Sequence, residues 1–295
     1  MLCLLRFLSV TAGALILSAV PGGHFAFIAA AHAQAPTTFI ASTAPPLLPA
    51  YSQPALPDPG YIWAPGYWGW NGAGYYWVPG YWALPPSADL LWTPGYWAWN
   101  DRDRDYVFHS GYWAPTVGYY GGINYGFGYT GEGYHGGFWR NHQFVYNRAV
   151  DDLGTAHVAS YANQAFAPAS HVSYNGGRGG TTARPTQAQL ATARQQQIGP
   201  TPVQIQHQQT ASRIRNQSYS ENKGAPPISA VARANDFTGV NTWLPWPHSI
   251  AGAPKPPHGP AIRNPLSEGG RSHGPTAATG AVKNFAQHPA TIRGP

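Results

Sequence analysis

The chain has 295 residues and a formal net charge of +6, yet only 9% of its residues are charged, while 35 are Gly and 30 are Pro. This Gly and Pro content is well above that of average globular proteins. Nine of the 12 Trp lie between Trp63 and Trp113. The composition therefore excludes a packed core over most of the chain and confines one to an aromatic-rich region of about 90 residues.

The N-terminus has the pattern of an export signal. Arg6 lies in a short basic segment, the 14 apolar residues "FLSVTAGALILSAV" follow, and "AHAQA" has small residues at the spacing that signal peptidase accepts. We expect cleavage after Ala33, so that residues 1–33 are a signal peptide and the mature chain begins at Gln34. An uncleaved anchor is the alternative, but 14 apolar residues are fewer than the roughly 20 that span a bilayer. We therefore expect no transmembrane span in the mature chain, and at most peripheral contact with a membrane.

Cysteine usage agrees with this location. The single Cys, Cys3, lies inside the signal, so the mature chain has no thiol. Disulfides, Cys-ligated metals and a lipid on a mature N-terminal Cys are excluded. We expect an exported protein of the periplasm or outer cell envelope, or a secreted one.

Four similar units follow a Pro-rich segment, residues 34–58, which we interpret as a linker. Aligned on Gly-Tyr-Trp, the units are "YIWAPGYW" (61–68), "YYWVPGYW" (75–82), "LLWTPGYW" (90–97) and "YVFHSGYW" (106–113). Their connectors vary: "GWNGAG", "ALPPSAD" and "AWNDRDRD". A constant unit with variable connectors is typical of a repeated structural element joined by surface turns.

The units are predicted to be strands, because Tyr, Trp, Val, Ile and Phe favour a pleated backbone. A Pro-Gly pair favours type I or II turns, which suit two-residue hairpins poorly, whereas Asn71-Gly72 fits the favoured primed type. We therefore place the hairpin turns in the connectors and interpret Pro-Gly as a bend or bulge within one strand per unit. A hairpin within each unit is the alternative.

The Gly-rich segment after Pro115 is expected to continue the sheet. Tyr125, Phe127 and Tyr129 alternate with Gly, which is a two-residue period, and residues 144–146 are expected to form a final strand. The predicted fold is mainly β: an antiparallel meander of aromatic Pro-Gly-Tyr-Trp repeats with Gly-rich strands over residues 59–150. A largely disordered tail with one or two short helices follows it.

The repeated "PGYW" units, the segment "GGINYGFGYTGEGYHGGFW" and the segment "FVYNRAV" together resemble the proteobacterial YXWGXW (WXXGXW) repeat proteins. The tail segments "HVSYNGGRGG" and "GPTPVQIQHQQTASRIRNQSY" are similar to those that follow the repeats in such proteins. The resemblance implies an exported protein and brings no catalytic residues. Phe108 and Ser110 depart from the pattern, since the first three units have Trp and Pro there.

The remainder divides into three segments by composition. Residues 151–185 form a transition, residues 186–222 are Gln-rich, and residues 223–295 are rich in Pro and Gly. Short helices are expected from Thr186 and from Thr201, the latter with a Thr N-cap and Pro at its first position. After Gly176, Lys and Arg outnumber Asp and Glu by twelve to three, so the net positive charge lies here. We expect disorder from Lys223 onward.

The sequence predicts neither catalysis nor a cofactor nor a metal. The His residues are scattered singly, without the spacing of a zinc site. "NDRDRD" (100–105) has carboxylates at alternate positions, as a calcium loop does, but Tyr106 and Tyr112 occupy the places of its essential Gly and Glu. We interpret it as a charged turn. Nucleophile and phosphate-binding motifs are likewise missing from the sequence, so we expect a protein that is not an enzyme.

Three functions remain from the sequence. The first is a structural or interaction role for an exported, envelope-associated repeat protein that presents an aromatic β surface. The alternative is a repeat module that binds glycan or peptidoglycan, because flat rings stack on sugars. The third is binding of a polyanion by the basic tail, for which export argues against genomic nucleic acid. The expected partner is a cell-envelope glycan or another copy of the chain.

Neighbouring Tyr and Trp in each unit point to opposite faces of a strand, so both faces are aromatic. We expect one face to remain open, since a large exposed apolar patch usually marks an interaction site. The candidate binding surface comprises Trp63, Tyr67, Trp68, Trp77, Tyr81, Trp82, Trp92, Tyr96, Trp97, Tyr112 and Trp113.

Overall fold

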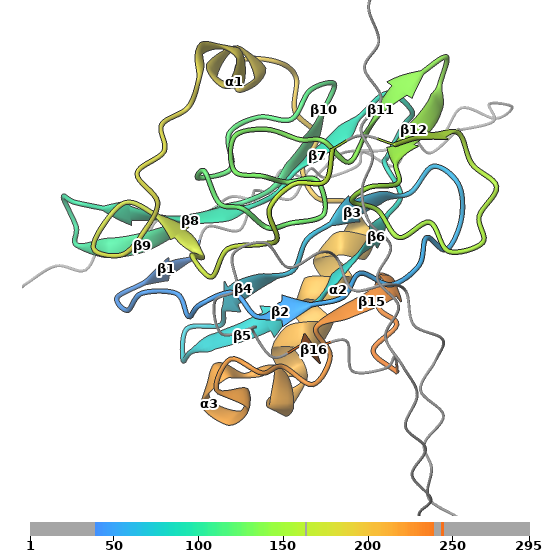
Figure 1. Ribbon diagram of the computed structural model, residues 1–295. Helices are drawn as coiled ribbons and strands as arrows, with labels where there is room; N and C mark the ends of the chain where they lie inside the picture. Colours follow the sequence, from blue (N-terminus) through green and yellow to red (C-terminus); the bar gives the residue numbers. More distant parts are fainter. Residues whose placement is uncertain (1–38, 163, 239–242, 245–295) are drawn as a thin grey trace, which may run out of the picture. The chain divides into compact units, whose positions relative to one another are not determined.

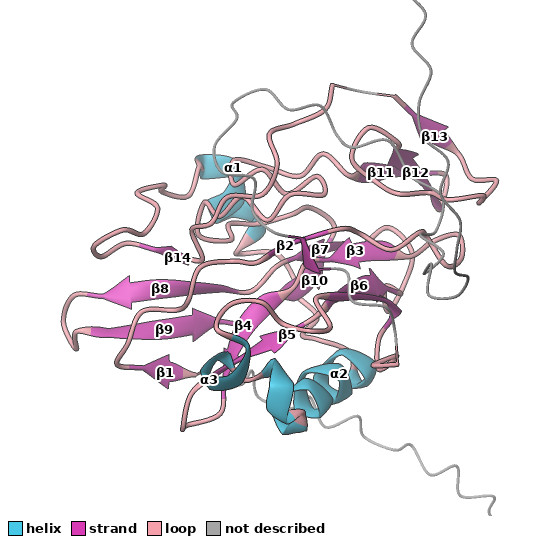
Figure 2. Cartoon of the chain, turned by 60° about the horizontal axis from the view of Figure 1, so that its bottom comes forward, coloured by secondary structure: helices cyan, strands magenta, loops and turns pink. Residues whose placement is uncertain are grey.

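The computed structural model describes residues 39–162, 164–238 and 243–244. The predicted signal peptide and most of the segment after Lys223 lie outside these residues. The described part is mainly strand with a few short helices, as the sequence predicted (Figures 1 and 2). None of its helices combines the length and the apolar character needed to cross a membrane.

The first two repeats form one long, bent antiparallel hairpin. Each repeat contributes two short strands, one on either side of its Pro-Gly bend. Residues Asn71 to Gly74 make the hairpin turn between the two repeats. The outer strands pair with Trp63 opposite Trp82, and the inner strands pair with Trp68 opposite Trp77. The strands are β3 (Ile62–Ala64), β4 (Tyr67–Trp70), β5 (Tyr75–Val78) and β6 (Gly80–Ala83).

The third and fourth repeats form a second hairpin of the same design. Its outer strands pair with Trp92 opposite Trp113, and its inner strands pair with Trp97 opposite Phe108. Residues 101–104, from the charged "NDRDRD" segment, are its exposed turn. The strands are β7 (Leu91–Thr93), β8 (Tyr96–Asn100), β9 (Asp105–His109) and β10 (Tyr112–Ala114).

This pairing confirms a bend at Pro-Gly, although each repeat is two short strands and not one continuous strand, and the alternative of a hairpin at Pro-Gly is wrong. The predicted meander is interrupted between the second and third repeats, where β6 pairs with β3 and β15 (Ala230–Arg233) instead of β7. The connector of residues 84–90 is therefore a link between two hairpins and not a hairpin turn itself. Short-range turn chemistry does not decide such pairing, because any strand with free backbone groups can take the edge.

Glycine at each bend allows the two strands of a hairpin to cross closely. A Cβ on Gly80 would lie 2.7 Å from Cζ2 of Trp63 and 2.9 Å from the backbone N of Gly66. A Cβ on Gly95 would lie 2.6 Å from Cζ of Phe108 and 2.9 Å from the backbone N of Gly111. The ring at the third position of each unit thus covers the bend of its paired unit. Phe108 covers Gly95 as Trp77 covers Gly66, so the fourth repeat keeps the packing in spite of its departure from Trp.

The Gly-rich segment after Pro115 is not the predicted extension of the sheet. Tyr125 and Tyr129 enter the core from a loop. Gly121, Gly122, Gly126 and Gly128 have φ between 66° and 87°, a left-handed conformation that interrupts an extended strand. The predicted final strand is confirmed as β12 (Gln143–Asn147), which pairs with β11 (Gly137–Arg140) and with β13 (Ser160–Tyr161).

The Pro-rich segment before the repeats packs against the core and is not a free linker. Leu48 and Leu56 are buried, and core indoles donate to its carbonyls: Trp82 Nε1 binds Pro54 O at 2.8 Å. The segment contains β1 (Ile40–Ala41), which pairs with β9, and β2 (Ala50–Tyr51), which pairs with β16 (Trp243–Leu244). An extended Pro-rich backbone keeps its carbonyl acceptors, which the buried Trp rings need as partners.

Both predicted helices are confirmed. Thr186 and Thr201 each form a capping box, and Pro202 takes the first position of α2 as expected. Ala211 of α2 is buried against Tyr76 and Val78 of β5. The remaining elements are β14 (Tyr174–Asn175), α1 (Gln187–Thr192), α2 (Pro202–Arg213), the 3-10 turn η1 (Arg215–Gln217) and α3 (Tyr219–Asn222).

Disorder from Lys223 is wrong for residues 224–238. Here β15 pairs in parallel with β6, and Ala230 and Val231 are buried. In Figure 2, α2 lies beneath the first hairpin, where it packs against β5. β15 forms because the edge of β6 offers it free backbone N–H and C=O groups, and a local pattern in the tail cannot predict this pairing.

Candidate functional site

The predicted aromatic binding surface is the core of the molecule. Eight of its eleven residues are buried, and Tyr67, Tyr96 and Tyr112 are half-buried. The prediction of an open aromatic face is therefore wrong for these residues. Those buried are Trp63, Trp68, Trp77, Tyr81, Trp82, Trp92, Trp97 and Trp113.

The Trp side chains interlock across each hairpin. Ring centroids are 5.4 Å apart for Trp63 and Trp82 and 5.2 Å apart for Trp68 and Trp77, both near edge-to-face. In the second hairpin, the Trp92 and Trp113 centroids are 5.1 Å apart. Such pairs contribute about 0.5–1.5 kcal/mol each beyond the area that they bury. The many aromatic rings of the repeats therefore serve to stabilise the fold.

Segments far from the repeats cover the rings and accept their hydrogen bonds. Trp77 Nε1 donates to Ser229 O at 2.9 Å, Trp113 Nε1 donates to Gln204 Oε1 at 2.8 Å, and Trp68 Nε1 donates to Leu47 O at 3.0 Å. We expected an open face because no element within the repeats could cover it. The face is closed by the Pro-rich segment and by α2 with the residues after it.

A buried tyrosine joins the two hairpins. The Tyr129 hydroxyl lies 2.9 Å from Trp92 O and 3.1 Å from Trp63 O. Burial raises the pKa of Tyr129 well above its ordinary value. The phenol therefore remains a neutral donor, and its role is to hold the hairpins together.

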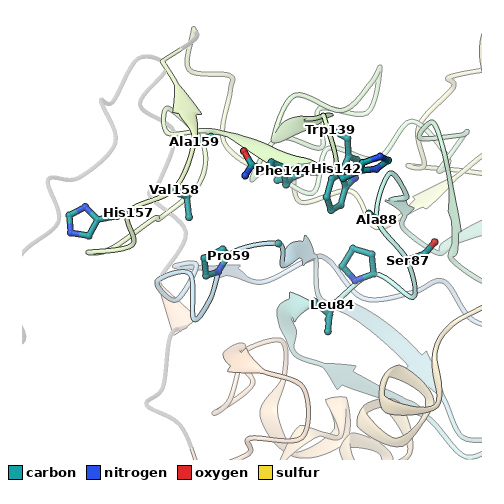
Figure 3. Close-up of a pocket in the computed structure, with 13 residues that line it drawn as sticks. Pro59, Leu84, Ser87, Ala88, Trp139, His142, Phe144, His157, Val158 and Ala159 are labelled. Carbon is teal, nitrogen blue, oxygen red and sulfur yellow. The ribbon is translucent and has the colours of Figure 1, made fainter.

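The strongest candidate site on the surface is a groove of about 470 Å³ between the connector of residues 84–90 and the β11–β12 hairpin. Figure 3 shows Trp139, His142 and Phe144 on the hairpin side, with Pro59 and Leu84 opposite. Its lining residues are Pro59, Gly60, Leu84, Pro85, Ser87, Ala88, Trp139, His142, Gln143, Phe144, His157, Val158 and Ala159.

A hydrogen-bonded His-Asp pair on strained backbone lies at the rim of this groove. His142 Nδ1 is 2.6 Å from Asp89 Oδ2, and the two side chains are 80% and 49% exposed. His142 and Asn141 form the β11–β12 turn with φ of 60° and 50°, and Asp89 has φ of 67°. Left-handed φ is uncommon outside Gly, although Asn, Asp and His adopt it more readily than other residues. The contact with Asp89 orients the imidazole and leaves Nε2 exposed at the groove.

Trp139 is held rigidly in the groove. Its Nε1 donates to Leu90 O at 2.9 Å, and its ring lies near edge-to-face on Phe144, with centroids 5.3 Å apart. The ring is half-buried, so part of it is accessible. The groove therefore combines a fixed flat ring with imidazole, amide and hydroxyl groups.

Sequence reasoning missed this site. The groove joins residues more than fifty positions apart, and no motif links the connector to the β11–β12 hairpin. The local signal was Asn141-His142 between two apolar runs, which is compatible with a primed turn and places His142 at the tip.

The described residues contain no group of three or more His, Cys, Asp or Glu side chains arranged to hold a metal. The "NDRDRD" carboxylates and amides instead bond within their turn, where Asn100 Nδ2 donates to Asp103 Oδ2 at 2.8 Å.

Comparison with protein families found two copies of the WXXGXW repeat, over residues 59–83 and 91–114. Each copy covers one bent hairpin, so the structural unit is a pair of the eight-residue repeats. No curated protein matched the chain, and no solved structure did.

Proposed function

We propose that this chain is a non-enzymatic, exported protein of the cell envelope, in which the aromatic repeats build a rigid scaffold with a structural or interaction role. The observation that supports it best is the burial of eight of the eleven candidate surface rings, six of them Trp side chains packed in pairs across the two hairpins. The repeats therefore act in folding, and the loops of the described residues are left to make contacts.

The absence of Cys from the mature sequence fits this role. Exported domains often rely on disulfides for stability, which this chain cannot form after removal of Cys3. Its Trp and Tyr rings bury up to about 150–250 Å² each and provide stability by packing instead. The WXXGXW repeats also support membership of the proteobacterial exported repeat proteins.

Catalysis is not part of the proposal. The most distinctive polar pair, His142 with Asp89, lies on exposed loops, with side chains 80% and 49% accessible. General acid–base and nucleophilic groups act best where water is excluded, and this pair is in water. Glycan binding by the repeat rings themselves loses its support, because a sugar cannot stack on a buried ring.

Export is tested by expressing the full chain in a bacterial host and fractionating the cells. We expect the protein in the envelope fractions with Gln34 at its N-terminus. Ala33→Arg places a large charged side chain at the cleavage site and should leave the signal attached, whereas Gln34→Glu should be processed normally. An intact Met1 start on the wild-type protein would refute the proposed location.

The structural or interaction role is tested with the purified mature protein. We expect it to sediment with isolated cell envelopes or to self-associate with increasing concentration in analytical ultracentrifugation. Trp77→Ala should unfold the protein instead of removing a binding surface, because Trp77 is fully buried. A protein that stays monomeric and in the supernatant under both conditions contradicts the proposal.

A further inference from the structure

We propose that the groove between residues 84–90 and the β11–β12 hairpin binds a short neutral oligosaccharide, with Trp139 stacking on a sugar ring and His142 and Gln143 bonding its hydroxyls. This inference names a partner class for the interaction role proposed above. The side chains assigned to binding, Trp139, His142 and Gln143, lie outside the two repeat copies, which end at Ala114. The inference is tested on purified protein, so that failure of export and failure of binding are distinguished.

The lining of the groove selects a neutral ligand. Its 13 residues include no Lys, Arg, Asp or Glu, and its titratable side chains are His142 and His157. A polyanion needs several cations to neutralise it, and a cationic ligand needs unpaired carboxylates. The carboxylates next to lining residues in the chain are both engaged, Asp89 by His142 and Asp58 by Arg233. The remaining groups are apolar rings and neutral hydrogen-bonding side chains.

The size of the groove and the rigidity of its ring suit a sugar. A volume of about 470 Å³ lies in the range of sites that hold small organic ligands. Trp139 is fixed on one side by Leu90 O and on another by Phe144, so little ring motion is lost on binding. A sugar ring has an apolar face of C–H groups that packs on such a ring, while its rim of hydroxyls requires donors and acceptors.

Those donors and acceptors are present beside Trp139. Gln143 is exposed and has both an amide donor and an amide acceptor. His142 uses Nδ1 toward Asp89, which orients the ring and leaves exposed Nε2 for a hydroxyl. His142 also occupies a turn position that Gly fills at lower conformational cost, with φ of 60°. The contact with Asp89 holds the imidazole in this turn, where it is positioned for binding.

The test is isothermal titration of the purified mature protein with cellotriose, chitotriose and maltotriose up to millimolar concentrations. We expect saturable binding of at least one of these sugars. Trp139→Ala should weaken it by about tenfold or more, as expected for loss of an aromatic platform. Phe138→Ala is the matched control, because Phe138 is the neighbour of Trp139 on β11, is 43% exposed and does not line the groove.

His142→Gly separates binding from folding. Gly relieves the left-handed strain, so thermal stability should be kept or raised, while affinity for the sugar should fall severalfold. The proposal is overturned by the absence of saturable binding to all three sugars, or by equal losses in Phe138→Ala and Trp139→Ala. It is also overturned if heparin binds while the neutral sugars do not, because that result assigns the surface to polyanions.

Discussion

Replacing Gly66 with Ala tests whether glycine at the repeat bends is required by close crossing of the strands. A Cβ on Gly66 would overlap Cζ2 of Trp77 and lie 2.9 Å from both Gly80 N and Val78 O. Two of these three atoms belong to the backbone of the paired repeat, so they cannot move aside by a change of rotamer. The Gly66 amide also donates to the Tyr51 hydroxyl at 3.0 Å, which anchors the bend further.

The expected loss of stability follows from two opposing effects. Overpacking a close-packed core costs about 1–3 kcal/mol, and contacts with backbone place this site at the upper end of that range. Replacing Gly with Ala lowers the entropy of the unfolded chain and returns about 0.4–1 kcal/mol. We expect Gly66→Ala to lower the free energy of unfolding by about 2 kcal/mol, which corresponds to a fall in Tm of about 4 to 8 °C.

Guanidinium unfolding of the purified mature protein, followed by Trp fluorescence, measures this change. Gly74→Ala is the control, since Gly74 lies in the hairpin turn of the same repeat pair and a Cβ there meets no atom within 4 Å. It should be neutral or slightly stabilising. If Gly66→Ala stays within 0.5 kcal/mol of the wild type, or if Gly74→Ala is equally destabilised, the reasoning on close crossing is refuted.

Three further predictions follow from buried groups and from the packed C-terminal segment. Tyr129→Phe leaves two buried carbonyls without their shared donor and should cost about 1–3 kcal/mol in denaturant unfolding, whereas Tyr219→Phe, at a residue 40% exposed, should cost little. Burial lowers the pKa of His207 to about 4, against 6.5 when unfolded. The unfolded state therefore binds the extra proton between these values, so His207 should reduce stability by roughly 3 kcal/mol as pH falls from 6.5 to 4. The free energy of unfolding of His207→Gln should fall less with pH over that range than that of the wild type. An equal fall in the two proteins contradicts the assignment. Limited proteolysis followed by mass spectrometry should retain residues 176–237 with the repeats, because α2 and β15 pack on them; early cleavage after Gly176 would show that this packing is weak.

The correct predictions from sequence concern features encoded within a few residues. Turn chemistry at Asn71-Gly72 placed the first hairpin turn in its connector, where the structure has it as a four-residue loop of residues 71–74 in which Gly72, but not Asn71, has positive φ. The N-caps Thr201 and Thr186 marked the starts of both helices. The alternation of rings with Gly after Pro115 was misleading, because a Gly that alternates can also adopt left-handed φ and form a loop.

The candidate site depends on contacts that are distant in the sequence. Asp89 and His142 come from separate loops, and their pairing follows from the packing of the β11–β12 hairpin beside the connector. The predicted aromatic surface failed for the same reason. The residues that cover it, such as Leu47 and Ser229, lie outside the repeats and have no distinctive local pattern.

By itself, the sequence determined the repeated unit: its strand character, its bend at Pro-Gly, the hairpin turns in the first and third connectors, and the concentration of rings that makes a core inevitable. These are consequences of backbone sterics and of alternation along a strand, which act over a few residues. Only the tertiary structure decided which strands pair, that a Pro-rich segment and the C-terminal α2 and β15 close the aromatic faces, and where a groove remains. A buried Trp needs a cover and an acceptor, but any segment that brings apolar surface and a free carbonyl can supply them, so the choice among distant segments is made by packing of the whole chain.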